Sequence, residues 1–147
     1  MEMTVELATA KSAPKVFTRY QSGCIPYRKV DGVVQVLLVK KTSKNAWWGF
    51  CKGGLESHLD KRENAAKECF EESGVTGTVT KKIGQFKYVK DNVKQLVYMY
   101  AMDFHTEFES WPEQKTRRRK WFTLAEARDK LGREHHGFLD KIRELAG

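Results

Sequence analysis

Three glutamates near the middle of the chain are the residues best suited to chemistry. Glu68, Glu71 and Glu72 are spaced i, i+3 and i+4, so a helix over residues 60–73 would place their carboxylates on one face. Three neighbouring anions repel one another unless a cation offsets their charge. Hard oxygen ligands suit Mg²⁺ or Mn²⁺, and phosphate oxygens can complete the shell of these ions. The spacing therefore predicts a metal site for phosphate chemistry.

The residues around the three glutamates favour this metal site over the alternative, a solvated acidic helix face. Gly53-Gly54 permits a tight backbone approach and a bend before the helix, and Gly74 is a natural helix stop. The opposite face of the helix offers an apolar stripe for the core. Its members are Ala65, Ala66, Cys69 and Phe70.

These residues resemble the Nudix box, G-x5-E-x7-R-E-U-x-E-E-x-G-U, where U is a bulky apolar residue. The matching positions are Gly53, Glu68, Cys69, Glu71, Glu72, Gly74 and Val75. Two positions depart from the pattern, because Leu59 replaces the early glutamate and Lys67 replaces the arginine. Arginine donates forked hydrogen bonds to carboxylates, whereas lysine supplies a point charge. Glu56 and Asp60 are the two candidates to replace the missing glutamate.

A longer resemblance, from about Arg19 to Leu145, is to the diphosphoinositol polyphosphate phosphohydrolases, which also cleave diadenosine polyphosphates. It is carried by Gly23 to Arg28, Val36 to Val39, Trp48, Gly77, Val97 to Tyr100 and Arg118 to Phe122. The resemblance implies an α/β/α sandwich with a mixed sheet between helices, and Mg²⁺-dependent hydrolysis of a phosphoanhydride, with Mn²⁺ as a substitute ion.

The resemblance also implies roles for individual residues. By position, the main-chain carbonyl of Lys52 and the side chains of Glu68 and Glu72 would hold the metal. Glu71 would be the general base and is a further candidate ligand, while Glu68 is the alternative base.

The substrate contacts of that branch are retained at some positions and lost at others. Arg19, Lys41, Lys94 and Arg117 match cationic or polar contacts, whereas Ser43, Asp91 and His135 replace basic residues. Trp47 and Trp48 should face opposite ways by alternation. We expect Trp48 to pack in the core, and Trp47 is a candidate substrate-binding residue that could stack on a nucleobase. We expect His135-His136 to be a surface pair near a helix start.

Length and composition indicate one globular domain. The chain has 147 residues, of which 40% are hydrophobic, enough for one sizeable core. We expect residues 1–14 to be a disordered N-terminal segment and residues 15–147 to form a single Nudix hydrolase domain. No run approaches roughly 20 apolar residues and no secretory signal is recognisable, so we expect a cytoplasmic protein without a membrane segment. Cys24, Cys51 and Cys69 lack C-x-x-C spacing and are expected to be core residues.

The order of the expected elements is strands, helix, strands, helix, which predicts a mixed sheet between helical layers. Expected strands cover 16–27, 33–39, 47–51, 77–90, 93–104 and 120–122, with hairpin turns at Asp31-Gly32 and Asp91-Asn92. Thr123 and Glu126 form a capping box for a helix, and residues 137–145 have helical periodicity. The strand over 93–104 is a candidate exposed edge that could dimerise.

The net charge of +8 indicates a polyanionic partner. The leading hypothesis is hydrolysis of a small polyphosphate, namely a dinucleoside polyphosphate, an inositol pyrophosphate or a nucleoside triphosphate. The alternative is an RNA 5′-pyrophosphohydrolase, in which basic residues would contact the trailing strand. A non-catalytic nucleotide-binding module is the third hypothesis. It is disfavoured because such modules typically lose acids of the box, and this chain keeps all three.

Overall fold

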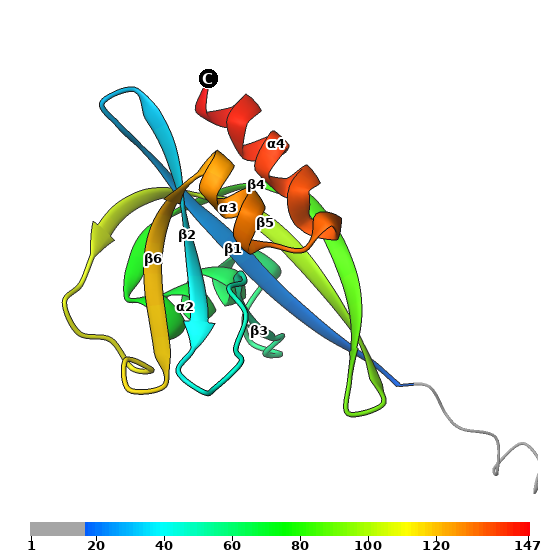
Figure 1. Cartoon of the computed structure of the whole chain (residues 1–147). Coiled ribbons are helices and arrows are strands. Elements are labelled where there is room, and N and C mark those ends of the chain that lie inside the picture. The colour runs from blue at the N-terminus through cyan, green and yellow to red at the C-terminus, as the bar shows by residue number, and fades with distance from the viewer. Residues whose placement is uncertain (1–16) are drawn as a thin grey trace, which may run out of the picture.

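The computed structural model describes residues 17–147, so the expected disorder of residues 1–14 lies outside the described residues. Its centre is a six-stranded mixed sheet with helices on both faces (Figure 1). The strands are β1 (Thr18–Val30), β2 (Val33–Lys41), β3 (Cys51–Gly54), β4 (Val75–Lys90), β5 (Val93–Glu107) and β6 (Arg117–Thr123). The predicted α/β/α architecture is confirmed.

The long strand β1 organises the sheet, whose order is β4-β5-β1-β2-β6. It pairs in parallel with β5 and antiparallel with β2, and it also pairs with the short β3. Both predicted hairpins are present. Positive φ angles of 52° at Asp31 and 78° at Gly32, and of 52° at Asp91 and 63° at Asn92, suit the tight turns that match the twist of paired strands.

Two helical layers cover the sheet and divide the core in two. Helix α2 (Lys61–Ser73) packs over one face, around the buried side chains of Cys24, Cys51 and Cys69. The other face carries α3 (Leu124–Lys130), the short 3₁₀ helix η1 (Arg133–His135) and α4 (His136–Ala146). The three cysteines are free and fully buried, as expected.

No helix of residues 17–147 is long and apolar enough to cross a membrane.

The ends of the helices follow the capping residues of the sequence. Asp60 and Glu63 form a capping box at the start of α2, and Gly74 ends it with a left-handed φ of 68°. Thr123 and Glu126 form the predicted capping box of α3.

Three expectations about the strands were wrong. The strand expected over 47–51 is shifted: β3 begins at Cys51 and includes both glycines, because Gly23 of β1 lets the Cys51 carbonyl approach to a distance that a Cβ would forbid. Strand β5 lies between β4 and β1 and is therefore no edge. Strand β6 begins at Arg117 rather than at residue 120, because it pairs with β2 along its whole length.

Candidate active site

The centre of the site is the crossing of β3 and α2 at Gly53. A Cβ placed on Gly53 would lie 2.1 Å from Cδ of Glu68, and one on Gly54 would lie 2.6 Å from Nη2 of Arg19. Neither glycine has a left-handed φ, so the expected glycine bend is wrong. The two glycines instead allow close approach to the backbone of β3. Because they have no side chains, the Glu68 carboxylate contacts Gly53 and the Arg19 guanidinium contacts Gly54.

Asn64 fixes the loop between β3 and α2, and the sequence arguments missed it. It is completely buried. Its Oδ1 accepts from the Glu56 N–H at 3.2 Å, and its Nδ2 donates to Ser22 Oγ at 3.0 Å and to the Gly53 carbonyl at 3.3 Å. Asn64 stands four residues before Glu68 and therefore shares the glutamate face of the helix. This spacing was the available signal, because an amide buried at such a position requires partners.

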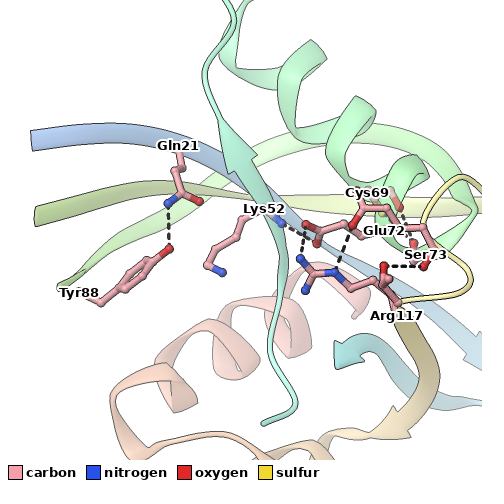
Figure 2. A network of polar contacts seen from close by, with 9 residues as sticks. Gln21, Lys52, Cys69, Glu72, Ser73, Tyr88 and Arg117 are labelled. Atoms are coloured by element: carbon pink, nitrogen blue, oxygen red, sulfur yellow. Dashed lines mark hydrogen bonds and ion pairs between the residues drawn. The ribbon is translucent and has the colours of Figure 1, made fainter. Parts of the chain in front are cut away.

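Glu72 is the most deeply buried of the three acids. Its side chain is 5% exposed, and Oε2 lies 3.3 Å from Nη2 of Arg117. Oε1 accepts from the Lys52 N–H at 3.3 Å, as Figure 2 shows. Burial raises the pKa of Glu72 to about 7, against the opposing effects of Arg117 and of the Lys52 N–H. The cost of burying this anion would be offset by a nearby cation.

Glu68 is half-buried beside Glu72 in α2. Burial raises the pKa of its carboxyl, and the negative charges of Glu71, Glu113 and Glu56 raise it further. Glu113 comes from the loop before β6, and its N–H donates to the Glu71 carbonyl at 2.9 Å. Five glutamates thus contribute negative charge to one region.

Lys67 connects two of these acids and accounts for both departures from the box pattern. Its Nζ lies 3.1 Å from Oε2 of Glu56 and 2.9 Å from Oε1 of Glu71. The two carboxylates raise the pKa of Lys67. Of the two candidates for the missing glutamate, Glu56 therefore makes the bracing contact, while Asp60 caps α2. A lysine suffices here because each contact is a single point contact rather than a fork.

The donor set fits a divalent hard cation, although the carboxylates do not form a finished cluster. Within residues 17–147, no three histidine, cysteine, aspartate or glutamate side chains are grouped closely enough to hold a metal ion. Glu68 faces Gly53, Glu71 faces Lys67 and Glu72 faces Lys52 and Arg117. All available donors are carboxylate or carbonyl oxygens, and burial raises the pKa of both Glu68 and Glu72, so their ionised forms would be stabilised by a nearby cation. Both properties suit Mg²⁺ or Mn²⁺.

The expected substrate residues fall into three places. Arg19 lines a hollow of about 550 Å³ together with Tyr20, Gly54 and Glu68. Lys41, Trp47 and Arg117 line a second hollow of about 260 Å³, which also includes Lys44 and Lys52. Lys94 lies apart, in a third hollow between β4, β5 and the start of β1. The structure therefore brings Arg19 and Arg117 next to the glutamates, places Lys41 and Trp47 in the same hollow as Arg117, and leaves Lys94 apart.

The two tryptophans differ in exposure as expected, although neither belongs to a strand and alternation is therefore not the cause. Trp47 is 85% exposed. Trp48 packs edge-on against Phe122, with ring centroids 5.1 Å apart. The exposed ring of Trp47 is therefore free to contact a ligand in the second hollow.

His135 is not the surface residue that the sequence suggested. Its ring lies 5.1 Å from that of Phe50, 4.6 Å from that of Phe86 and 6.0 Å from that of Phe138. Burial lowers its pKa, and the positive charge of Lys52 lowers it further. His135 directly precedes the amphipathic helix α4, and the packing of this helix on the sheet places the His135 ring among the aromatic residues. No local pattern in the sequence indicated this position.

A second polar group flanks Lys52 and was also missed. Gln21 donates to Tyr88 Oη at 2.8 Å and to Gln95 Oε1 at 2.7 Å, and Nζ of Lys52 lies 5.3 Å from the Tyr88 ring centroid. Figure 2 shows Lys52 between this group and the Glu72–Arg117 pair. Gln21 lies in β1 and Gln95 in β5, and nothing in the sequence indicated that these two glutamines would contact each other.

Comparison with known proteins identifies the family. A model of the NUDIX domain matches residues 18–142, so the chain belongs to the Nudix family, as the box predicted. Nudix hydrolase 4 of Arabidopsis thaliana is 41% identical over 117 residues, covering 73% of this chain and 56% of that relative. Diphosphoinositol polyphosphate phosphohydrolase 3-beta of Bos taurus is 28% identical over 109 residues, covering 73% of this chain and 65% of its own length.

A solved structure agrees with the fold. The crystal structure of a C. elegans Ap4A hydrolase binary complex superposes with a TM-score of 0.72 at 20% identity, covering 86% of this chain and 96% of that chain. At this identity the likeness shows the fold alone. The chain spans little more than half the length of the Arabidopsis relative.

Proposed function

We propose that the protein is a hydrolase that cleaves a phosphoanhydride in a small polyphosphate with the help of Mg²⁺. The observation that carries the proposal is the set of glutamates on α2 held against a glycine strand, with cationic hollows on two sides. The names of the relatives support it, since one is a diphosphoinositol polyphosphate phosphohydrolase and another is an Ap4A hydrolase. The substrate is a dinucleoside polyphosphate, an inositol pyrophosphate or a nucleoside triphosphate.

In this proposal Glu68, Glu72 and the carbonyl of Lys52 would hold the metal, with Glu71 as a further candidate ligand. Mg²⁺ held there would supply the positive charge that neutralises phosphate oxygens and polarises the attacking water. Glu71 accepts the proton of that water, and Glu68 is the alternative base. Lys67 holds Glu71 at 2.9 Å, so it orients the carboxylate for proton transfer. Arg19, Lys41 and Arg117 contact the phosphate chain.

Trp47 would then contact the part of the substrate beyond the phosphates. Its exposed ring borders the hollow that contains Lys52 and Arg117, and base stacking on an aromatic ring is worth about 1–3 kcal/mol. We expect Trp47→Ala to raise KM for diadenosine tetraphosphate by about tenfold, while KM for an inositol pyrophosphate stays within twofold. Steady-state kinetics with both substrates measure the difference, and an equal effect on both would contradict a nucleobase contact.

The test is a competition assay in Mg²⁺. Diadenosine tetraphosphate, an inositol pyrophosphate, a nucleoside triphosphate and a short 5′-triphosphate RNA are mixed, and each product is followed by mass. Preferential loss of a small polyphosphate would identify the substrate. Glu71→Gln is the inactive reference and Glu144→Gln, on the exposed face of α4, is the matched control. Equal activity of the wild type and Glu71→Gln would refute the proposed site.

The alternative function is removal of pyrophosphate from RNA 5′ ends. The basic surface favours it because a trailing strand would gain lysine contacts. An RNA pyrophosphohydrolase would cut 5′-triphosphate oligomers better than the mononucleotide, with efficiency falling steeply as salt rises. Equal rates on both substrates would argue against RNA.

A further inference from the structure

A second surface lies where the sheet extends past α2. Alternate residues of β1, β4 and β5 carry side chains on the same side of the sheet as α2, and these side chains are exposed or half-buried. They are Thr18, Tyr20, Gln85, Lys87, Lys94, Leu96 and Tyr98, and we call them the open sheet face. The strand register places Tyr20 beside Leu96, and Lys87 on the other side of Leu96.

The centre of the open sheet face is aromatic and is flanked by ammonium groups. The rings of Tyr20 and Tyr98 are stacked, with centroids 6.4 Å apart and planes at 10°. Lys61 Nζ lies 4.1 Å from the Tyr98 ring centroid, and Lys82 Nζ lies 5.0 Å from it. Tyr20 is 47% exposed. A planar ligand can therefore stack on Tyr20 while anionic groups reach lysines on both sides.

The hollow on this face is cationic. It has a volume of about 430 Å³ and includes Lys87, Lys94, Tyr20 and Leu96, and none of the described residues that line it is acidic. Lys81 and Lys82 lie within β4 next to its irregular pairing with β5. This irregularity leaves Lys82 free to reach over Tyr98.

The open sheet face is continuous with the glutamate site through one residue. Tyr20 lines the cationic hollow and also the hollow that contains Arg19, Gly54 and Glu68. A flexible ligand with a phosphate group at Glu68 can therefore continue past Tyr20 onto the sheet.

We propose that the open sheet face binds single-stranded RNA, with the 5′ phosphates of the strand at Glu68. Stacked tyrosines with adjacent lysines match the alternation of bases and phosphates in such a strand. Stacking accepts every base, so binding is independent of sequence. For the position of the 5′ end this inference rests on the alternative function, removal of pyrophosphate from RNA 5′ ends, and it adds the surface that holds the rest of the strand.

The test separates binding of the strand from catalysis. A fluorescein-labelled oligouridylate of about ten nucleotides, with a 5′ hydroxyl, is titrated with full-length protein in EDTA, and anisotropy gives Kd. We expect Tyr20→Ala to raise Kd by about tenfold and Tyr20→Phe, which keeps the ring, to leave it within twofold. Lys82→Ala/Lys87→Ala should also weaken binding and lower the slope of log Kd against log salt by about 1.4. Lys29→Ala/Lys130→Ala removes the same charge from exposed positions near the end of β1 and in α3 and should leave Kd unchanged.

Several results would overturn the inference. They are absence of RNA binding by the wild type, equal Kd for Tyr20→Ala and Tyr20→Phe, and equal losses in the two lysine pairs. Sedimentation showing a dimer that Tyr20→Ala dissociates would assign the face to a second copy of the chain and also overturn it. Hydrolysis of small polyphosphates by the wild type is measured separately in Mg²⁺. Its absence would refute the proposed function and leave the EDTA binding result to decide this inference.

Discussion

Burial of Glu72 predicts that the metal-free protein becomes less stable as pH rises towards neutrality. The pKa of its carboxyl rises from 4.5 to about 7 on folding, so between these values the folded state binds more protons than the unfolded state. Ionisation then costs the folded state more than the unfolded state. The full difference corresponds to about 3.4 kcal/mol at about 1.36 kcal/mol for each pKa unit.

Part of this free-energy difference can be measured, and the variant Glu72→Gln isolates the contribution of Glu72. Between about pH 5 and about pH 7.5 the two pKa values imply a loss of about 2 kcal/mol in the free energy of unfolding. His135 acts in the opposite direction, because its lowered pKa makes stability rise with pH. Glu72→Gln keeps an acceptor for the Lys52 N–H and leaves His135 unchanged. The wild type should therefore lose about 2 kcal/mol more than Glu72→Gln over this range.

The assay is urea unfolding in EDTA at both pH values, followed by circular dichroism. Mg²⁺ favours the ionised carboxylate, so adding it at about pH 7.5 should stabilise the wild type more than Glu72→Gln, and more than it does at about pH 5. Parallel pH profiles of the wild type and Glu72→Gln would refute the reasoning. They would mean that Arg117 and Lys52 fully compensate the buried charge.

Three further predictions concern the residues around Glu72. Glu71→Gln should lower kcat by about 10²- to 10⁴-fold while circular dichroism stays unchanged, and near-normal turnover would exclude Glu71 as the base. Lys67→Met and Glu56→Gln should each lower kcat by about 10- to 100-fold, because both residues position Glu71. Lys67→Arg keeps the positive charge and should retain most of the activity. If the losses of the two single variants add up in the double variant, the two residues do not act through a shared contact. Gly53→Ala should weaken Mg²⁺ binding in calorimetry and cost about 1–3 kcal/mol of stability, since a Cβ would lie 2.1 Å from Cδ of Glu68. Gly137→Ala, whose Cβ would meet nothing within 4 Å, is the control without a clash and should not lower stability.

Local signals determined the elements that carry the site. The i, i+3, i+4 spacing of the glutamates and the helix stop at Gly74 predicted α2 almost to the residue. The turns at Asp31-Gly32 and Asp91-Asn92 predicted both hairpins. These predictions succeeded because each depends on the conformational preferences of a few adjacent residues. The Nudix box, itself a local pattern, was enough to identify the family.

Strand boundaries and strand neighbours could not be predicted in this way. The position of β3 depends on how closely Gly23 lets Cys51 approach, and the interior place of β5 depends on its parallel pairing with β1. Both are contacts between residues far apart in the chain. Periodicity reports which residues can form a strand but not which strand lies beside it.

The sequence by itself determined which residues could bind a metal, and the tertiary structure decided their surroundings. Only the folded chain shows that Lys67 bridges Glu56 and Glu71, that Glu72 is buried against Lys52 and Arg117, and that His135 lies among aromatic rings. The physical reason is that the protonation state of a side chain depends on its burial and on the charged groups near it in space. A carboxylate's pKa and partners are therefore properties of the packed structure, whereas its spacing along a helix is a property of the sequence.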